Sequence, residues 1–197
     1  SRPDAHGPHL TLRRQRIFQQ TTTAVPPTRH YLRFHDWDRH LTETDDKSAL
    51  RLSARAARAG FVAGLDPMAH RLAFRALPTP LRALLGDRQC IALYASVNDE
   101  APAQRLADTL MAEGKQLCLP RLVNRVGGME FRAWEPGAAL EEGPFSTRHP
   151  EQTAEICHPD AIIAPCVAFD SRLMRLGQGG GHYDRIFARY PDALRIG

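Results

Sequence analysis

The sequence predicts an α/β domain with three layers, in which a mostly parallel sheet lies between flanking helices and a glycine-rich phosphate loop lies near the C-terminal end. Two observations predict this class. Short apolar runs, typical of strands that are buried on both faces, alternate with segments of helical spacing. The chain has 197 residues, of which 43% are hydrophobic and 24% charged, and this suits one globular domain that buries a real core.

The first predicted elements of this domain are helices. Residues 47–64 carry apolar side chains at helical spacing, and we expect one apolar face formed by Leu50, Ala54, Ala57 and Phe61. Asp66 is a good N-cap before Pro67, so a second helix is predicted to begin there and to stop before Pro78. A third short helical turn is expected at 81–86.

The strands follow. Residues 89–95 predict a buried strand, which a helix at 101–113 connects to a second strand at 116–120. This unit has the right length for a right-handed parallel crossover. The remaining predicted elements are an antiparallel strand at 129–134, a buried strand at 161–169, a helix at 182–189 and an apolar fragment at 193–197.

The N-terminal part of the chain differs from the rest. Residues 1–46 hold five of the nine histidines and no apolar periodicity long enough for an ordinary helix, so we expect a poorly ordered extension before a domain at 47–197. No window approaches 18 uninterrupted apolar residues, and no secretion signal is recognisable. These observations predict a cytoplasmic protein without a membrane partner.

The charge balance indicates the kind of ligand. Lys and Arg number 26 against 22 Asp and Glu, which leaves a formal net charge of +4, and the two signs are interspersed. This pattern suits small anionic ligands better than a long polyanion. An RNA-binding protein would need a basic face with interleaved aromatic residues, and aromatics make up only 7%. We therefore expect no nucleic-acid partner.

The four cysteines are Cys90, Cys118, Cys157 and Cys166. They form no C-x-x-C pair and lie in or beside apolar runs. This pattern favours buried reduced thiols over disulfides or a zinc site.

The glycine loop is the most informative segment. A buried strand leads through glycines at 177, 179, 180 and 181 into a helix. Glycine lets backbone N–H groups approach an anion, and the helix N-terminus adds its partial positive charge. Phosphate binding is the physical interpretation, with a tight turn as the alternative. The pattern is not a Walker loop, and G-x-G-x-x-G fails because residue 182 is His.

The run from Arg175 to Arg185, preceded by Ala-Phe-Asp at 168–170, resembles the signature of the 5-formyltetrahydrofolate cyclo-ligase family, whose members are also called 5,10-methenyltetrahydrofolate synthetases. Agreement extends from Lys47 to Gly197. It takes in Lys47 with Arg51, Tyr94-Ala95-Ser96 with Glu100, the segment 114–120, and Phe145.

This resemblance implies an ATP- and Mg²⁺-dependent closure of 5-formyltetrahydrofolate to 5,10-methenyltetrahydrofolate, with ADP and phosphate as products. Transfer of the γ-phosphoryl group to the formyl oxygen makes an activated imidate. The nearby N10 amine then attacks this imidate and expels phosphate. The protein would supply mostly positioning and charge neutralisation.

The resemblance also implies a set of site residues. Those for ATP are Lys47, Arg51, Arg175, Leu176, Gly177, Gln178, Gly179, Gly180, Gly181, His182 and Tyr183. Those for the folate substrate are Ala95, Glu100, Phe145, Gln178, Gly179, Gly180, Gly181 and His182. Gln178 and Tyr183 would be catalytic, and Asp184 would be the Mg²⁺ ligand.

Physical arguments accompany several of these assignments. Lys47 and Arg51 lie one helical turn apart, so their cations can converge on one polyphosphate, although an exposed pair is the alternative. Glu100 follows a strand end and can pair with the N–H donors of a reduced pterin, or serve only as a helix cap. Phe145 would lie against the folate or in a satellite of the core. Asp184 can also face the helix dipole.

Two departures from the family pattern lower the expected nucleotide affinity. Gln178 stands where relatives commonly have Arg or another basic residue, and His182 replaces the commoner Tyr. The alternative function is therefore a catalytically weak or silent relative that binds folate or nucleotide. Because family members continue beyond position 197, we also expect the domain to lack its C-terminal strands. We expect a monomer.

Overall fold

The computed structural model describes residues 43–123 and 128–197. Positions 1–42 of the predicted extension lie outside these residues. The first helix, α1 (Glu43–Ala63), begins before the predicted domain boundary at Lys47.

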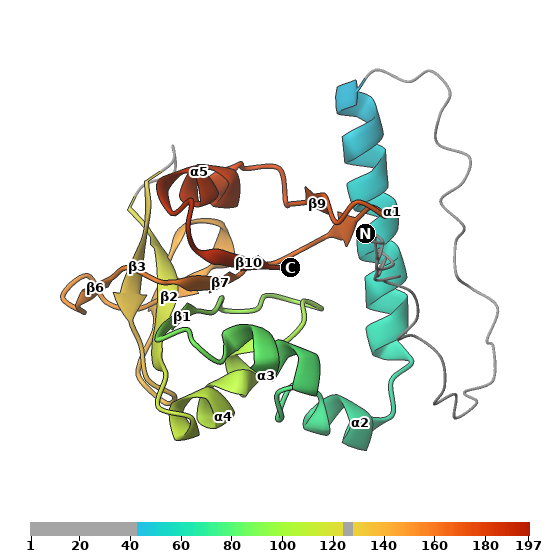
Figure 1. The fold of residues 1–197 in the computed structure, drawn as a ribbon. Helices are drawn as coiled ribbons and strands as arrows, with labels where there is room; N and C mark the ends of the chain where they lie inside the picture. The colour runs from blue at the N-terminus through green and yellow to red at the C-terminus, as the bar shows by residue number, and fades with distance from the viewer. Residues whose placement is uncertain (1–42, 124–127) are drawn as a thin grey trace, which may run out of the picture. The chain divides into compact units, whose positions relative to one another are not determined.

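A six-stranded sheet forms the centre of the described domain (Figure 1). Its strand order is β10-β7-β1-β2-β3-β6. Strands β10, β7, β1 and β2 are parallel to one another, and β3 runs antiparallel to its neighbours β2 and β6. The predicted α/β class with a mostly parallel sheet is therefore confirmed, and the phosphate-binding role of the glycine loop stays a prediction. The strands are β1 (Cys90–Ala92), β2 (Gln116–Leu122), β3 (Met129–Ala133), β6 (Ile156–Cys157), β7 (Ala161–Ile163) and β10 (Leu194–Ile196).

Helices cover both faces of this sheet, which gives the three layers (Figure 1). The core has two clusters, one on each face of the sheet, and successive residues of β1 belong to different ones. Ile91 packs in one cluster with Leu85 and Leu110, whereas Ala92 packs in the other with Ile162 and Ile186. Because side chains alternate along a strand, one continuous apolar run serves both clusters. The covering helices are α3 (Thr79–Leu85) and α4 (Ala107–Ala112) on one face and α5 (His182–Arg189) on the other.

The predicted N-cap at Asp66 is confirmed. Its carboxylate accepts hydrogen bonds from the backbone N–H groups of Met68 and Ala69, at 2.8 and 3.0 Å. The helix that it starts, α2 (Pro67–Leu72), ends earlier than predicted, because Phe74 adopts a φ of 62° and turns the chain. Within the described residues, no helix has both the length and the apolar composition needed to cross a membrane.

Three sequence predictions need correction. The expected apolar face of α1 is not buried: Phe61 is 68% exposed, and no residue from 46 to 63 is fully buried. The helix predicted at 101–113 begins as a short 3-10 turn, η1 (Ala103–Leu106). The strand predicted at 161–169 is divided into β7 and β8 (Ala168–Phe169), and Pro165 between them has no N–H for a sheet bond.

Two small hairpins outside the main sheet were not predicted as such. Strand β8 pairs with β9 (Arg175–Leu176) in a hairpin outside the main sheet, and this hairpin leads into the glycine loop. Strands β4 (Glu141–Glu142) and β5 (Arg148–His149) form a second hairpin around the turn η2 (Pro144–Ser146). The apolar fragment near the C-terminus is β10, which joins the sheet beside β7 as expected.

Candidate active site

A cavity of about 740 Å³ lies beside the carboxyl ends of the parallel strands. Its wall includes Tyr94 and Ala95 after β1, Pro165 after β7, and the loop that precedes α5. Ligands of open α/β sheets bind at this edge. Helix α1 closes one side of the cavity, so residues from distant parts of the sequence meet there.

Arginine side chains give the cavity a strong positive charge. The lining holds Glu100 and Asp184 as its carboxylates. Low-dielectric walls with one dominant sign of charge concentrate ligands of the opposite sign. The cavity therefore fits an anionic ligand. The lining arginines are Arg51, Arg55, Arg58, Arg148 and Arg175.

Two of these arginines connect α1 to the glycine loop. The Arg51 Nε–H donates to the carbonyl oxygen of Gly177 at 2.9 Å. Arg55 donates to the side-chain oxygen of Gln178, whose amide nitrogen donates in turn to Glu100 at 2.7 Å. Gln178 thus links a cation and a carboxylate on opposite sides of the loop.

The backbone of the loop requires glycine at two positions. Gly179 has a φ of +108° and Gly181 a φ of +64°, conformations that residues with a Cβ adopt only with strain. Gly181 is also the N-cap of α5 and makes no side-chain capping bond. The first backbone N–H groups of this helix are therefore available to an anion.

Tyr183 has a buried hydroxyl that makes no hydrogen bond within the described residues. Burial raises the pKa of this phenol, and the neighbouring Tyr94 and Glu100 raise it further. The Nε of Arg58 is likewise buried without a hydrogen-bond partner in the described part of the chain. Both residues line the cavity. Buried polar groups are nearly always hydrogen-bonded, so these two indicate where a ligand would supply the missing partners.

Arg175 and Asp184 form an ion pair, with 2.7 Å between Arg175 Nη2 and Asp184 Oδ1. The guanidinium of Arg175 also lies over the rings of Tyr183 and Phe187, at 5.7 and 5.6 Å from their centroids. It is held firmly and is only 16% exposed, whereas Asp184 is 74% exposed at the rim. Next to this pair, burial and the nearby Arg185 lower the pKa of His182.

The family model for the 5-formyltetrahydrofolate cyclo-ligase family matches residues 44–195. The chain belongs to the 5-formyltetrahydrofolate cyclo-ligase family. It is 33% identical over 105 residues to 5-formyltetrahydrofolate cyclo-ligase of Escherichia coli K12. This match covers 51% of this chain and 58% of the relative. The enzyme of Haemophilus influenzae is 30% identical over 116 residues, 55% of this chain and 62% of the relative. The chain thus spans little more than half the length of these curated relatives.

Solved structures of this family share the fold. The solution NMR structure of 5,10-methenyltetrahydrofolate synthetase from Aquifex aeolicus has a TM-score of 0.60 at 27% identity, covering 76% of this chain and 75% of that chain. The 5,10-methenyltetrahydrofolate synthetase of Mycoplasma pneumoniae has a TM-score of 0.53 at 20% identity, covering 73% and 78%. This second likeness shows the fold alone.

Most of the site residues expected from the cyclo-ligase resemblance line the one cavity. They are Arg51, Ala95, Glu100, Arg175, Gly177, Gln178, Gly179, Gly180, Gly181, His182, Tyr183 and Asp184. Lys47 is exposed on α1 and does not belong to the lining, and neither does Leu176. Phe145 lies in η2, and its side chain is outside the described part.

Several residues that line the cavity were not predicted from the sequence. Arg55 and Arg58 lie four and seven positions after Arg51, a spacing that places all three on one face of a helix. This stripe of arginines was visible in the sequence and would have predicted them. Asn98 and Arg148 come from loop and hairpin segments and carried no comparable signal.

Replacing Tyr183 by phenylalanine should stabilise the free protein by about 1 kcal/mol, because it removes a buried hydroxyl that lacks a partner. The same change should weaken the binding of an anionic ligand in the cavity, which Tyr183 lines. Thermal unfolding and ligand titration measure the two effects. Tyr190→Phe is the control, because the Tyr190 hydroxyl contacts His158 outside the cavity. A loss of stability in Tyr183→Phe would mean that the hydroxyl is already satisfied.

Proposed function

We propose that this chain binds ATP and 5-formyltetrahydrofolate in the cavity and forms 5,10-methenyltetrahydrofolate, releasing ADP and phosphate. The observation that carries the proposal is the cationic cavity at the glycine loop, whose wall holds two buried polar groups without a hydrogen-bond partner among the described residues. The family to which the chain belongs supports the choice of reaction. ATP and a folate with its glutamate carboxylates are both anions, as the charge of the cavity requires.

The glycine loop and α1 form the proposed phosphate site. Backbone N–H groups around Gly179 and the N-terminus of α5 are donors of the kind that bind phosphate. Arg51 holds the loop by the bond from its Nε to Gly177, and its Nη groups would donate to a phosphate. The same side chain would therefore shape the loop and neutralise the charge that develops during phosphoryl transfer.

Glu100 and Tyr183 form the proposed folate side. The Glu100 carboxylate already accepts from Gln178 and from the backbone N–H of Val97 at 3.2 Å, so it is fixed in place to accept from a pterin N–H. The neutral phenol of Tyr183 can donate a hydrogen bond to the formyl oxygen. Such a donor would orient this oxygen toward the γ-phosphate and restrain it during attack.

Asp184 fits a supporting role in Mg²⁺ binding. Within the described residues, no two further Asp, Glu, Cys or His side chains lie close enough to Asp184 to complete a set of three metal ligands. Mg²⁺ usually takes one or two carboxylates together with phosphate oxygens and water, so one exposed carboxylate at the rim suffices. When bound, the ion would neutralise phosphate charge. Asp184 would then share its carboxylate between the ion and Arg175.

The direct test is to mix the protein with 5-formyltetrahydrofolate, ATP and Mg²⁺ and to follow the near-ultraviolet absorbance of the methenyl product. We expect product only when all three are present, with ADP released in equal amount. Binding of both ligands without product would favour the alternative, a catalytically silent relative. Failure to bind either ligand would overturn the proposal.

Substituting Arg51 and Lys47 separately tests the phosphate site. Arg51→Ala should weaken ATP binding by roughly 1.5–3 kcal/mol, the contribution of a charge-assisted hydrogen bond. Lys47→Ala should weaken ATP more than folate, as the sequence predicts, but less than Arg51→Ala because Lys47 does not line the cavity. Calorimetry with each ligand measures the differences. A larger loss in Lys47→Ala would place the phosphates outside this cavity.

A further inference from the structure

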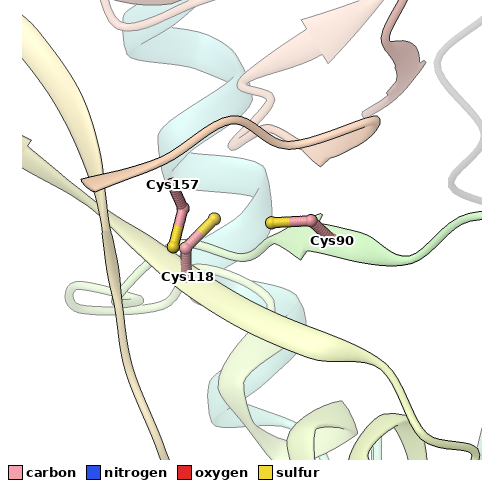
Figure 2. A group of neighbouring side chains, drawn as sticks. All are labelled: Cys90, Cys118 and Cys157. Carbon is pink, nitrogen blue, oxygen red and sulfur yellow. The ribbon is translucent and has the colours of Figure 1, made fainter. Parts of the chain in front are cut away.

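Three of the four cysteines meet within the core cluster that α5 covers. Cys90, Cys118 and Cys157 are buried, and their sulfur atoms lie within 4.8 Å of one another. They come from strands β1, β2 and β6, which are far apart in the sequence. Figure 2 shows the three side chains gathered in one place, with the sulfur of Cys90 pointing toward the other two cysteines. The sequence contained no short motif that could indicate this cluster.

The three cysteines are free thiols. In the register of β1 and β2, Ala92 pairs with Cys118 and Cys90 pairs with Gln116, so Cys90 and Cys118 are diagonal neighbours and do not lie directly opposite each other. Three free thiols in one place are the kind of ligand set that a soft metal ion takes.

We propose that Cys90, Cys118 and Cys157 form a three-thiolate site for a soft metal ion, and that Cu(I) is the ion that fits best. Thiolates select soft cations such as Cu(I). A structural Zn²⁺ site needs four ligands, and no fourth Cys, His or carboxylate joins this group within the described residues. Metal–sulfur bonds of about 2.3 Å in a planar triangle place the sulfurs about 4.0 Å apart. The observed cluster needs only a small contraction to reach that geometry.

The surroundings of the cluster suit a soft ion. Phe131, Ile162 and Ile186 pack in the same core cluster, so water and hard oxygen ligands are largely excluded. The thiols of Cys118 and Cys157 now make weak hydrogen bonds to the carbonyl oxygens of Ile91 and Glu155, at 3.8 and 3.9 Å. An ion would replace these contacts and release to solvent the protons of the thiols that it binds.

An entry route exists at the edge of the sheet. Strand β6 is an edge strand of two residues, Ile156 and Cys157, and Ile156 is 50% exposed. Short edge strands open more readily than the centre of a sheet. Opening of β6 would uncover Cys157 and the space between the other two sulfurs without disturbing the parallel strands β1 and β2.

Cys166 provides a matched control. It is partly exposed, donates to the carbonyl oxygen of Ala168 at 2.9 Å and does not belong to the cluster. Anaerobic titration of the full chain with Cu(I), in competition with a chromogenic chelator of known affinity, should give one ion per chain. Cys166→Ala should keep this binding, whereas Cys90→Ala, Cys118→Ala and Cys157→Ala should each weaken it by roughly 100-fold or more.

Thermal unfolding supplies a second measurement, which stays informative if a variant binds weakly. Cu(I) should raise the Tm of the wild type and of Cys166→Ala but not that of the three cluster variants. If Cys118→Ala does not fold, Cys90→Ala supplies the comparison, because Cys90 is less deeply buried and its loss should disturb the core less. No Cu(I) binding by the wild type, or an equal loss in Cys166→Ala, would overturn the proposal. Tighter binding of Zn²⁺ than of Cu(I) would also overturn the three-coordinate assignment.

Discussion

Replacing Gly179 by alanine should lower the proposed cyclo-ligase turnover by roughly 100-fold, the loss expected when a catalytic loop is misplaced by about 1 Å. Gly179 has a φ of +108°. A Cβ there would meet Arg51 only at ordinary contact distance, 3.6 Å from Cζ, so the change acts through backbone strain and not through a clash. Relief of the strain should shift the loop away from Arg51 and from the N-terminus of α5.

The matched control for this change is Gly137→Ala. Gly137 has a φ of +86°, and a Cβ there would meet no atom within 4 Å. Both substitutions strain a left-handed glycine, but Gly137 does not line the cavity. Turnover and thermal unfolding should therefore show a similar loss of stability in both variants and a loss of turnover in Gly179→Ala alone. Full turnover of Gly179→Ala would mean that this loop does not bind the phosphates.

Arg58→Met should reduce kcat/KM for at least one co-substrate by roughly 10- to 100-fold, the range that corresponds to one lost charge-assisted hydrogen bond. The Nε of Arg58 is buried at the cavity without a partner in the described residues. Methionine keeps most of the aliphatic stem and removes the charge. Comparison of kcat/KM for ATP with that for the folate would identify which anion faces Arg58.

The control for Arg58 is Arg82→Met. Arg82 pairs with Glu113 at 2.8 Å and does not line the cavity. Both changes remove one positive charge, so any long-range effect of net charge is common to them. Unchanged kinetics in Arg58→Met would show that neither co-substrate pairs with the Nε of Arg58.

The parallel part of the fold could be predicted because its signals are local. The apolar runs around Ile91 and Ile162 and the helical spacing after Ala101 report burial and periodicity directly. The face of α1 could not be predicted in this way. Its alanines and Phe61 indicated an apolar face, yet the helix presents its arginines to the cavity and leaves Phe61 exposed. Tertiary contacts decided that orientation.

Residue patterns alone predicted the candidate site only where one segment carries it, whereas Arg51, Ala95 and Glu100 were expected from the family resemblance. The glycines at 177, 179, 180 and 181 lie close together in the sequence, so a loop could be predicted there. The link from Arg55 through Gln178 to Glu100 joins three segments, and no local pattern encodes it. The cluster of Cys90, Cys118 and Cys157 depends on strand order and register in the same way. Such juxtapositions require the three-dimensional structure.

The exposure of α1 has a consequence for the motions of the domain. Residues 46–63 of this helix contribute no fully buried side chain, and hydrogen bonds from Arg51 and Arg55 fasten it to the glycine loop. An element held this way opens at a free-energy cost set by a few polar contacts and not by global unfolding. A phosphate bound by both the arginines and the loop would hold α1 against the loop and disfavour this opening. Part of the interaction free energy would then offset the ordering of α1, so the measured affinity would understate the strength of the individual contacts.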